Sequence, residues 1–425
     1  MKTSIFSVIS SLFFIATPLY AEVTYLTAAR LIDPVSNGEI SEPAFIITDG
    51  KITARGTRVT LAVPDGADRV DLGGKTILPG FIDMHTHLLG SATKGRGYDG
   101  YAFSRDRNVI WGVQNAHDTI MAGFTSVRNV GAANFSDIAL RDAIDEGEVV
   151  GPRMFVSGPP VGIIGGHCSD DNRMPPEHER RGENAATGPW EMRERVRRNI
   201  KFGVDLIKTC STGGVFSKGT LLGAPQSTVE ELRAIVDEAH MRGLKVASHA
   251  HGTQGIRNAI DAGVDTIEHA SFLDDETIRL AKRKGVFLSM DIYNTEFTLG
   301  EGEALGVPEE SLNKEREVGT IQRESFTNAV KAGVKVVYGT DSGVYPHKDV
   351  ANQFSRMVRF GMTPMQAIGA ATNVAAQALG REGELGCLDV GCRADIVAVN
   401  EDPLSDISVL EGVNFVMKGG AIIKQ

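Results

Sequence analysis

Two histidines separated by a single residue, His85 and His87, close the apolar segment GFIDMHTHLLG that spans residues 80–90. Because alternate residues of a strand project from the same face, both imidazoles can reach one metal ion. The same pair could instead be two solvated polar residues at the end of a strand. His249 and His269 each end a further segment of strand-like composition. This recurrence favours a metal site over solvated strand ends.

A lysine and an aspartate extend the set of candidate ligands. Lys208 lies in the apolar segment VDLIKTCSTGG, where a buried ammonium group needs a lowered pKa, a partner or a chemical change. One interpretation is an ion pair with a neighbouring carboxylate. The other is a carbamate, formed when the neutral amine adds carbon dioxide, which supplies oxygen ligands to two cations. Asp341, in GTDSG, is either a metal ligand that also moves protons or only a helix cap.

Short β-rich segments alternate with amphipathic helical patterns from about residue 77 onward, and this alternation predicts how the polar residues are brought together. Eight strands are expected, at Ile77–His85, Phe124–Val130, Arg153–Ser157, Val204–Thr209, Lys245–His249, Thr266–His269, Val286–Asp291 and Lys335–Thr340. The pattern predicts an α/β fold of the (β/α)8 TIM-like barrel type, although a doubly wound sheet has the same local pattern. The candidate ligands fall at the carboxyl ends of these strands, which converge on one mouth in a barrel.

Both ends of the chain differ from this pattern. Residues 1–21 combine Lys2, an apolar stretch and the small residue Ala21, which predicts a signal peptide, and the apolar stretch is shorter than the roughly 20 residues that a membrane span needs. Residues 22–76 and 384–425 have the pattern of short strands and turns, and each segment alone is too small to bury a β core. We therefore expect one composite β-sandwich domain from 22–76 and 384–425 beside a metal-dependent barrel domain at 77–383. The signal peptide predicts an exported protein, periplasmic in a Gram-negative bacterium.

Charge and cysteine content narrow the class of protein. The formal net charge of -10 argues against a nucleic-acid partner, because binding phosphates needs a cationic face. Four cysteines are too few for a disulfide scaffold in a chain of 425 residues. Cys387 and Cys392 are close enough in sequence to pair, but spacing alone does not show that they do.

The segments GFIDMHTH, LIKTCSTGG, SHAHG, IEHAS and GTDSG, in this order and spacing, resemble the amidohydrolase superfamily. Within it the chain is similar to the imidazolonepropionase-related group, which includes exported prolidase-like and carboxypeptidase-like enzymes and ochratoxin amidase-like hydrolases. The resemblance covers essentially the whole chain after the expected signal peptide. It implies a binuclear metal centre, usually zinc, with N6-carboxylysine at Lys208 between two divalent ions. The implied ligands are His85, His87 and Asp341 on one ion and His249 and His269 on the other.

The chemistry of such a centre agrees with the residue types present. Two cations lower the pKa of a water that bridges them, which provides hydroxide at neutral pH. Asp341 can accept the proton of this water and pass it to the leaving nitrogen of an amide.

Two further histidines are candidate catalytic residues. His251 lies two residues after His249, hence on the same strand face, where it could donate to the substrate carbonyl or carboxylate or make a structural loop hydrogen bond. His167 follows two glycines in VGIIGGHCSDDNR, and similar peptidases carry a histidine at this place. Arg173 and Arg257 are candidates to bind a substrate carboxylate. The remaining histidines are expected at the surface: His117, His178, His240 and His347.

We therefore expect a binuclear metal-dependent amide hydrolase that releases a C-terminal amino acid from dipeptides or N-acyl amino acids. The alternative is a hydrolase that opens a cyclic amide or imide with the same metal centre. An exported binding protein without catalysis is disfavoured, because all six expected ligands are present. The expected partner is a small molecule or short peptide, with no stable membrane insertion, and the resemblance implies assembly as a homo-oligomer.

Overall fold

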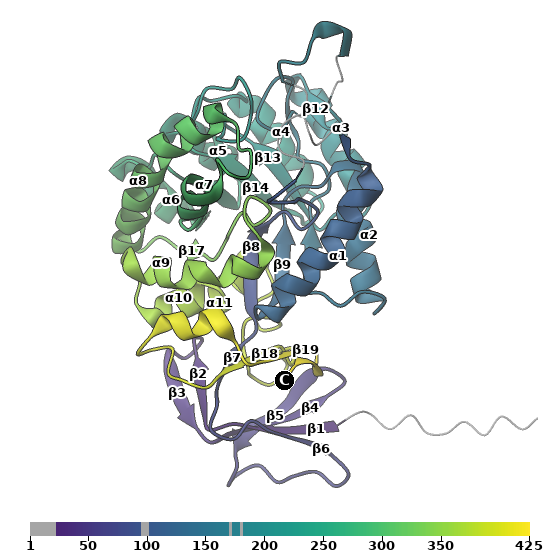
Figure 1. Ribbon diagram of the computed structural model, residues 1–425, viewed down its shortest axis with the longest axis vertical. Coiled ribbons are helices and arrows are strands. Elements are labelled where there is room, and N and C mark those ends of the chain that lie inside the picture. Colours follow the sequence, from purple (N-terminus) through teal and green to yellow (C-terminus); the bar gives the residue numbers. More distant parts are fainter. Residues whose placement is uncertain (1–22, 95–101, 170–171, 179–181) are drawn as a thin grey trace, which may run out of the picture.

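The computed structural model describes residues 23–94, 102–169, 172–178 and 182–425. The expected signal peptide at residues 1–21 lies outside these residues. Figure 1 shows one part in which helices surround strands, and a second part formed by strands from both ends of the chain. In the portion of the chain that the structure describes, no helix has the length and apolarity of a membrane span.

Eight parallel strands position the candidate ligands, which lie in these strands or directly after them. One sheet contains β8 (Phe81–Thr86), β9 (Phe124–Asn129) and β10 (Arg153–Val156), and the other contains β13 (Leu206–Cys210), β14 (Lys245–Ala250), β15 (Thr266–His269), β16 (Phe287–Ser289) and β17 (Val336–Val337). Backbone hydrogen bonds join the two sheets next to their outer strands. The N–H of Val161, which follows β10, donates to the Lys208 carbonyl of β13, and the N–H of His87, which follows β8, donates to the carbonyl of Ser342, which follows β17, both at 2.8 Å. The carboxyl ends of all eight strands therefore lie on one side.

The first predicted strand, Ile77–His85, is wrong as a single element. It divides at Gly80 into β7 (Thr76–Pro79) and β8, and β7 pairs with β18 (Ile396–Val399) and β2 (Arg30–Asp33) in a different sheet. A Cβ atom at Gly80 would lie 2.3 Å from Thr125 Oγ1, so only glycine lets the chain pass this close to β9. Both strands are buried, and a continuous apolar run does not show where one ends.

Helices follow most of the parallel strands. Their bounds are α1 (Arg105–Met121), α2 (Ser136–Asp145), α3 (Gly188–Lys201), α4 (Val229–His240), α5 (Thr253–Ala262), α6 (Asp275–Lys284), α7 (Asn294–Glu301), α8 (Glu309–Ala332), α9 (Gln353–Arg359), α10 (Pro364–Ala370) and α11 (Asn373–Leu379). At the start of α4, Thr228 and Glu231 form a capping box, in which each side chain accepts a hydrogen bond from the other residue's backbone N–H. The 24-residue helix α8 is followed by its C-cap residue Gly333, whose φ of 71° lies in the left-handed region that favours glycine.

Two further sheets combine the chain ends. The four-stranded sheet contains β1 (Val23–Thr27), β4 (Pro43–Thr48), β5 (Lys51–Thr57) and β6 (Asp68–Asp71), and the six-stranded sheet contains β2, β3 (Gly38–Ser41), β7, β18, β19 (Phe415–Lys418) and β20 (Ala421–Lys424). One hydrophobic cluster joins Leu26 and Phe45 to Ile396 and Phe415, so residues from both ends share a core.

Candidate metal centre

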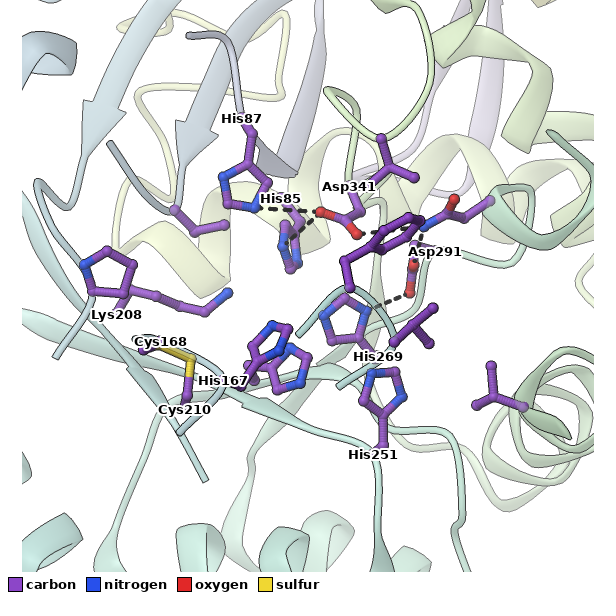
Figure 2. A pocket seen from close by; sticks show the side chains of 18 of the residues that line it. His85, His87, His167, Cys168, Lys208, Cys210, His251, His269, Asp291 and Asp341 are labelled. Atoms are coloured by element: carbon purple, nitrogen blue, oxygen red, sulfur yellow. Dashed lines mark hydrogen bonds and ion pairs between the residues drawn. A yellow bond between two sulfur atoms is a disulfide. The ribbon is translucent and has the colours of Figure 1, made fainter. Parts of the chain in front are cut away.

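All six expected ligands and both candidate catalytic histidines line one cavity of about 250 Å³ (Figure 2). His85, Lys208, His249 and His269 lie in the parallel strands, and the other residues lie in segments that follow such strands. The structure therefore brings together the whole set of site residues that the sequence predicts: His85, His87, His167, Lys208, His249, His251, His269 and Asp341.

One group of potential ligands consists of His85, His87 and Asp341, whose ligand atoms lie within 4.8 Å of one another. The Nε2 atoms of both histidines are 3.3 Å from Asp341 Oδ1. Nδ1 of His85 is 2.9 Å from Glu268 Oε2, and Arg128 holds the same carboxylate at 2.6 Å. This carboxylate favours a proton on Nδ1 and leaves Nε2 as the metal-binding atom. Burial alone would raise the pKa of Asp341, yet the neighbouring histidines hold it well below its usual value.

His249, His251 and His269 form a second group within the same distance limit. Nδ1 of His251 is 2.8 Å from Ser271 Oγ, and Nδ1 of His269 is 2.9 Å from Asp291 Oδ1. His249 Nε2 is buried and has no hydrogen-bond partner among the residues described, which a bound metal ion would explain. Burial, with nearby histidines, lowers the pKa of both His249 and His251 well below the usual value, so both are neutral, as ligands must be.

Lys208 lies between the two groups of ligands in Figure 2 and is only 3% exposed. In the described part of the chain, no carboxylate lies within ion-pair distance of its Nζ, so the ion pair that the sequence left open is not observed. Burial lowers its pKa to about 8. A substantial share of this amine is thus neutral near pH 8, and the neutral amine is the form that reacts with carbon dioxide.

Four polar residues that the sequence analysis did not single out also line the cavity: Asp291, Asn294, Glu315 and Gln322. Asn294 Nδ2 donates to Asp291 Oδ2 at 3.0 Å and to Asp341 Oδ2 at 3.3 Å, and Gln322 Nε2 donates to Asp291 Oδ1 at 2.8 Å. This network orients Asp341 through one of its oxygens and leaves the other toward the histidines. Asp291 ends the predicted strand Val286–Asp291, just as several of the predicted ligands end theirs. This position at a strand end was the signal in the sequence that could have identified Asp291 as a site residue.

Backbone conformation is strained at two of the ligands. His269 and Asp341 have φ angles of 69° and 57°, in the left-handed region that non-glycine residues rarely adopt. Such strain persists where surrounding structure fixes it, and it gathers at functional sites. Contacts with the surrounding structure therefore fix the orientation of these two side chains, against the intrinsic backbone preference of histidine and aspartate.

A disulfide that the sequence did not predict joins Cys168 to Cys210, and both residues line the cavity. It ties the loop that carries His167 to the strand that carries Lys208. The His167 ring stacks on His249 with centroids 3.8 Å apart, and its Nδ1 is 2.8 Å from Ser217 Oγ. A second disulfide joins Cys387 to Cys392, the pairing that spacing permitted but did not show.

We expect the double variant Cys168→Ser/Cys210→Ser to lose roughly tenfold in kcat/KM and up to about 4 kcal/mol of stability, because the bond closes a loop of 42 residues beside the ligands. The matched control is Cys387→Ser/Cys392→Ser, which opens a loop of 5 residues whose cysteines do not line the cavity and should leave activity unchanged. Urea unfolding and steady-state kinetics measure both effects. Equal activity loss in the two variants would contradict the positioning role of the first disulfide.

Among the predictions outside the ligand set, those for two arginines and one histidine are wrong, and those for two other histidines are confirmed. Neither Arg173 nor Arg257 lines the cavity, and Arg257 instead pairs with Asp274 and Glu276. His347, expected at the surface, is 3% exposed, with Nδ1 3.3 Å from Thr119 Oγ1. It lies in a 3-10 turn that packs against α1, and its sequence context did not show this contact. His117 and His240 are exposed as expected, whereas the side chain of His178 lies outside the described ones.

Glu315, on α8, is 4% exposed, and Thr295 Oγ1 donates to its Oε1 at 2.5 Å. Burial raises its pKa from 4.5 to about 7. A carboxyl group whose pKa is raised by folding contributes its full stability below pH 4.5, and this contribution is lost as pH rises through about 7. We therefore expect metal-free Glu315→Gln to gain stability over metal-free wild type, little at pH 4 and on the order of 3 kcal/mol at pH 8. Urea unfolding across this pH range measures the difference, and a pH-independent difference would contradict the expectation.

Parallel strands with helices, whose carboxyl ends gather histidines and an aspartate around one cavity, define a hydrolase of the metal-dependent amidohydrolase type. The chain belongs to the Amidohydrolase family, which matches residues 76–423, and this confirms the resemblance seen in the sequence. It is a hydrolase that acts on amide bonds.

Three relatives illustrate the similarity. Ochratoxinase of Aspergillus niger is 31% identical over 437 residues, which cover 96% of this chain and 88% of the relative. The crystal structure of a Xaa-Pro dipeptidase with bound methionine in the active site superposes with a TM-score of 0.89 at 36% identity, covering 95% of this chain and 100% of that one. The structure of a prolidase complexed with N-methylphosphonate-L-proline gives a TM-score of 0.87 at 31% identity, with the same coverage.

Proposed function

We propose that this protein is a binuclear metal-dependent amide hydrolase that releases a C-terminal amino acid from dipeptides or N-acyl amino acids. The observation that carries the proposal is one cavity that several groups of His and Asp ligand atoms share with a buried lysine, which has no ion-pair partner among the described residues. A site for one ion would not require this lysine. A carboxylated Lys208 would supply anionic oxygen ligands for two adjacent cations.

The residues present fit two divalent metal ions, for which we propose zinc. His85, His87 and Asp341 would hold one ion and His249 and His269 the other, with carboxylated Lys208 between them. The orphaned Nε2 of His249 and the neutral state of the buried imidazoles support this assignment. When bound, such ions activate water and polarise a carbonyl group.

The chain's own residues move the protons and position the substrate. Asp341 takes up a proton at its carboxylate and returns it to the leaving nitrogen, while Asn294 keeps one of its oxygens fixed. His251 and His167 lie on the cavity wall, where an imidazole N–H can donate to the substrate carbonyl or carboxylate. Val130, Pro160, Val215, Phe216, Val318 and Val344 provide the apolar lining that excludes water.

The names of the relatives support this substrate class. Xaa-Pro dipeptidase and prolidase act on dipeptides by name, and the first was crystallised with the amino acid methionine in its active site. The similarity to ochratoxinase extends the proposal to N-acyl amino acids, including ochratoxin-type amides.

We also propose how the whole molecule is built and where it acts. The eight parallel strands would close into a (β/α)8 barrel, supported by the hydrogen bonds at both junctions between the two sheets. The two antiparallel-rich sheets of the chain ends would form the β-sandwich. Two disulfides support an exported, periplasmic location, because such bonds persist in oxidising compartments.

The test combines metal analysis with an assay of amino acid release. Purified protein should contain about two metal ions per chain and release an amino acid from members of a panel of dipeptides, N-acyl amino acids and ochratoxin. Two bound metals without turnover of any linear amide would reject the peptidase assignment in favour of cyclic amides or imides. Protein reconstituted with zinc that binds no metal would reject the centre itself.

A further inference from the structure

Glu315 is a buried carboxylate in the wall of the catalytic cavity that the proposed reaction does not use. It lies on α8 together with Val318 and Gln322, at the three- and four-residue spacing that places side chains on one face of a helix. All three residues line the cavity. Gln322 reaches the ligand shell, since it donates to Asp291 Oδ1 and to the His269 carbonyl. Glu315 therefore belongs to the helix face that covers the metal centre.

No lysine or arginine of the described residues forms an ion pair with this carboxylate. Burial raises its pKa, and the charge of Arg323 offsets this only in part. Its Oε1 accepts a hydrogen bond from Thr295, and no donor in that part of the chain bonds its Oε2. Arg323, about two turns further along α8, is 3.6 Å from Glu296 and bonds the Ile292 carbonyl. A buried carboxyl group without a partner takes up a proton, whereas a cationic ligand in the cavity would hold it ionised. The position of Glu315 at the cavity wall therefore suits such a ligand.

The charges of the residues around the cavity also favour a cationic ligand. Among the described residues that line it, Asp291, Glu315 and Asp341 are acidic, and Lys208 is the one lysine or arginine. Carboxylation would turn Lys208 into an anion as well. Arg173 and Arg257, the candidates for binding a substrate carboxylate, lie elsewhere. The two proposed metal ions would offset the charges of Asp341 and the carbamate. No lysine or arginine of the described residues lines the cavity at the Glu315 wall, which disfavours an anionic group there and favours a positively charged one.

The position of Glu315 is fixed by close packing. Thr295 stands on α7 against Gly319 of α8, where an added Cβ would lie 2.3 Å from Thr295 Cγ2. The glycine thus lets the two helices approach closely enough for the Thr295 hydroxyl to hold the carboxylate. A preorganised carboxylate loses little entropy when it binds a ligand.

We propose that Glu315 binds a protonated amine of the substrate, so that the enzyme prefers amides with a free ammonium group over neutral N-acyl amino acids. This inference rests on the proposed function and names the substrate class within it. The ammonium group can be the α-amine of a dipeptide or the side-chain amine of a basic N-terminal residue. Both present the same chemistry to the carboxylate, and a charge-assisted hydrogen bond forms with either.

Four amides of one C-terminal amino acid, chosen by the release assay, separate these sources. The leucyl amide carries the α-ammonium and the 4-methylpentanoyl amide is the same molecule without it. The 6-aminohexanoyl amide carries a side-chain ammonium alone, and the hexanoyl amide lacks it. Glu315→Gln should lower kcat/KM for one or both ammonium substrates roughly 10- to 100-fold more than for the matched neutral amide. The pair that shows this difference identifies which amine Glu315 binds.

The control variant is Glu309→Gln on the same helix, whose exposed carboxylate pairs with Arg316 and should leave all four rates unchanged. Glu315→Asp keeps the negative charge but places it one methylene farther from the cavity. Its effect on the ammonium substrates should therefore be smaller than that of the glutamine variant. Equal losses on charged and neutral amides, or no loss on any, would overturn the inference while leaving the amide hydrolase intact. Metal-loaded wild-type protein that hydrolyses none of the panel would overturn the proposed function and this inference together.

Discussion

Replacing Asp341 with asparagine is expected to lower kcat by roughly three orders of magnitude, within the range that loss of a positioned general acid or base produces. The amide does not accept a proton at neutral pH, whereas Asp341 faces the Nε2 atoms of His85 and His87 at 3.3 Å. Asparagine tolerates the left-handed backbone conformation at this position, so the loss would not arise from added strain. Steady-state kinetics, with metal content measured on the same samples, test the expectation.

The matched control is Asp349→Asn, a partly buried aspartate that does not line the cavity. It should keep nearly full activity. An Asp341→Asn protein with two metals and a kcat within tenfold of wild type would show that another group transfers the proton. Asp291, the other aspartate of the same hydrogen-bond network, would then be the next candidate.

Lys208→Ala has the second large expected effect. This variant cannot form the proposed carbamate, so the chain should retain one metal ion or none. Activity should fall by a factor of about a thousand or more, because the proposed water activation and second cation site would both be lost. The fold should survive, since Lys208 has no ion pair among the described residues that its removal would break. Melting temperature, metal content and kcat/KM are the measurements.

Chemical rescue distinguishes a carbamate from an ordinary lysine. A short carboxylate such as acetate or propionate can occupy the space left by the lysine side chain and present two oxygens to the metals, so it should restore part of the activity of Lys208→Ala. The control is Lys245→Ala, at the opposite end of the neighbouring strand, where the lysine pairs with Asp265 at the surface. Full activity and two metals in Lys208→Ala would exclude the bridge.

The residues that gather in the cavity could be predicted from the sequence because their signals are local. Polar residues such as His85, His249 and His269 stand out at the ends of apolar strand segments, and parallel strands bring such ends together.

What the sequence did not reveal depends on contacts between distant segments. Glu315 and Gln322 look like ordinary polar positions of an amphipathic helix, and nothing local shows that this face of α8 covers the cavity. Cys168 and Cys210 lie 42 residues apart, and only the fold brings them together. His347 became buried for the same reason, through its contact with α1.

The position of β7 has a consequence for the order in which the molecule can assemble. β7 leads across one residue into β8, the strand that carries His85, and in its own sheet Pro79 pairs with Ile396. Contacts between such distant positions raise the contact order and form late, because the intervening chain must first lose its freedom. β7 can therefore pair with β18 only after the ribosome has made nearly the whole chain. Shortening the chain before Ile396 would remove that neighbour and disturb a site whose ligands all lie upstream of the cut.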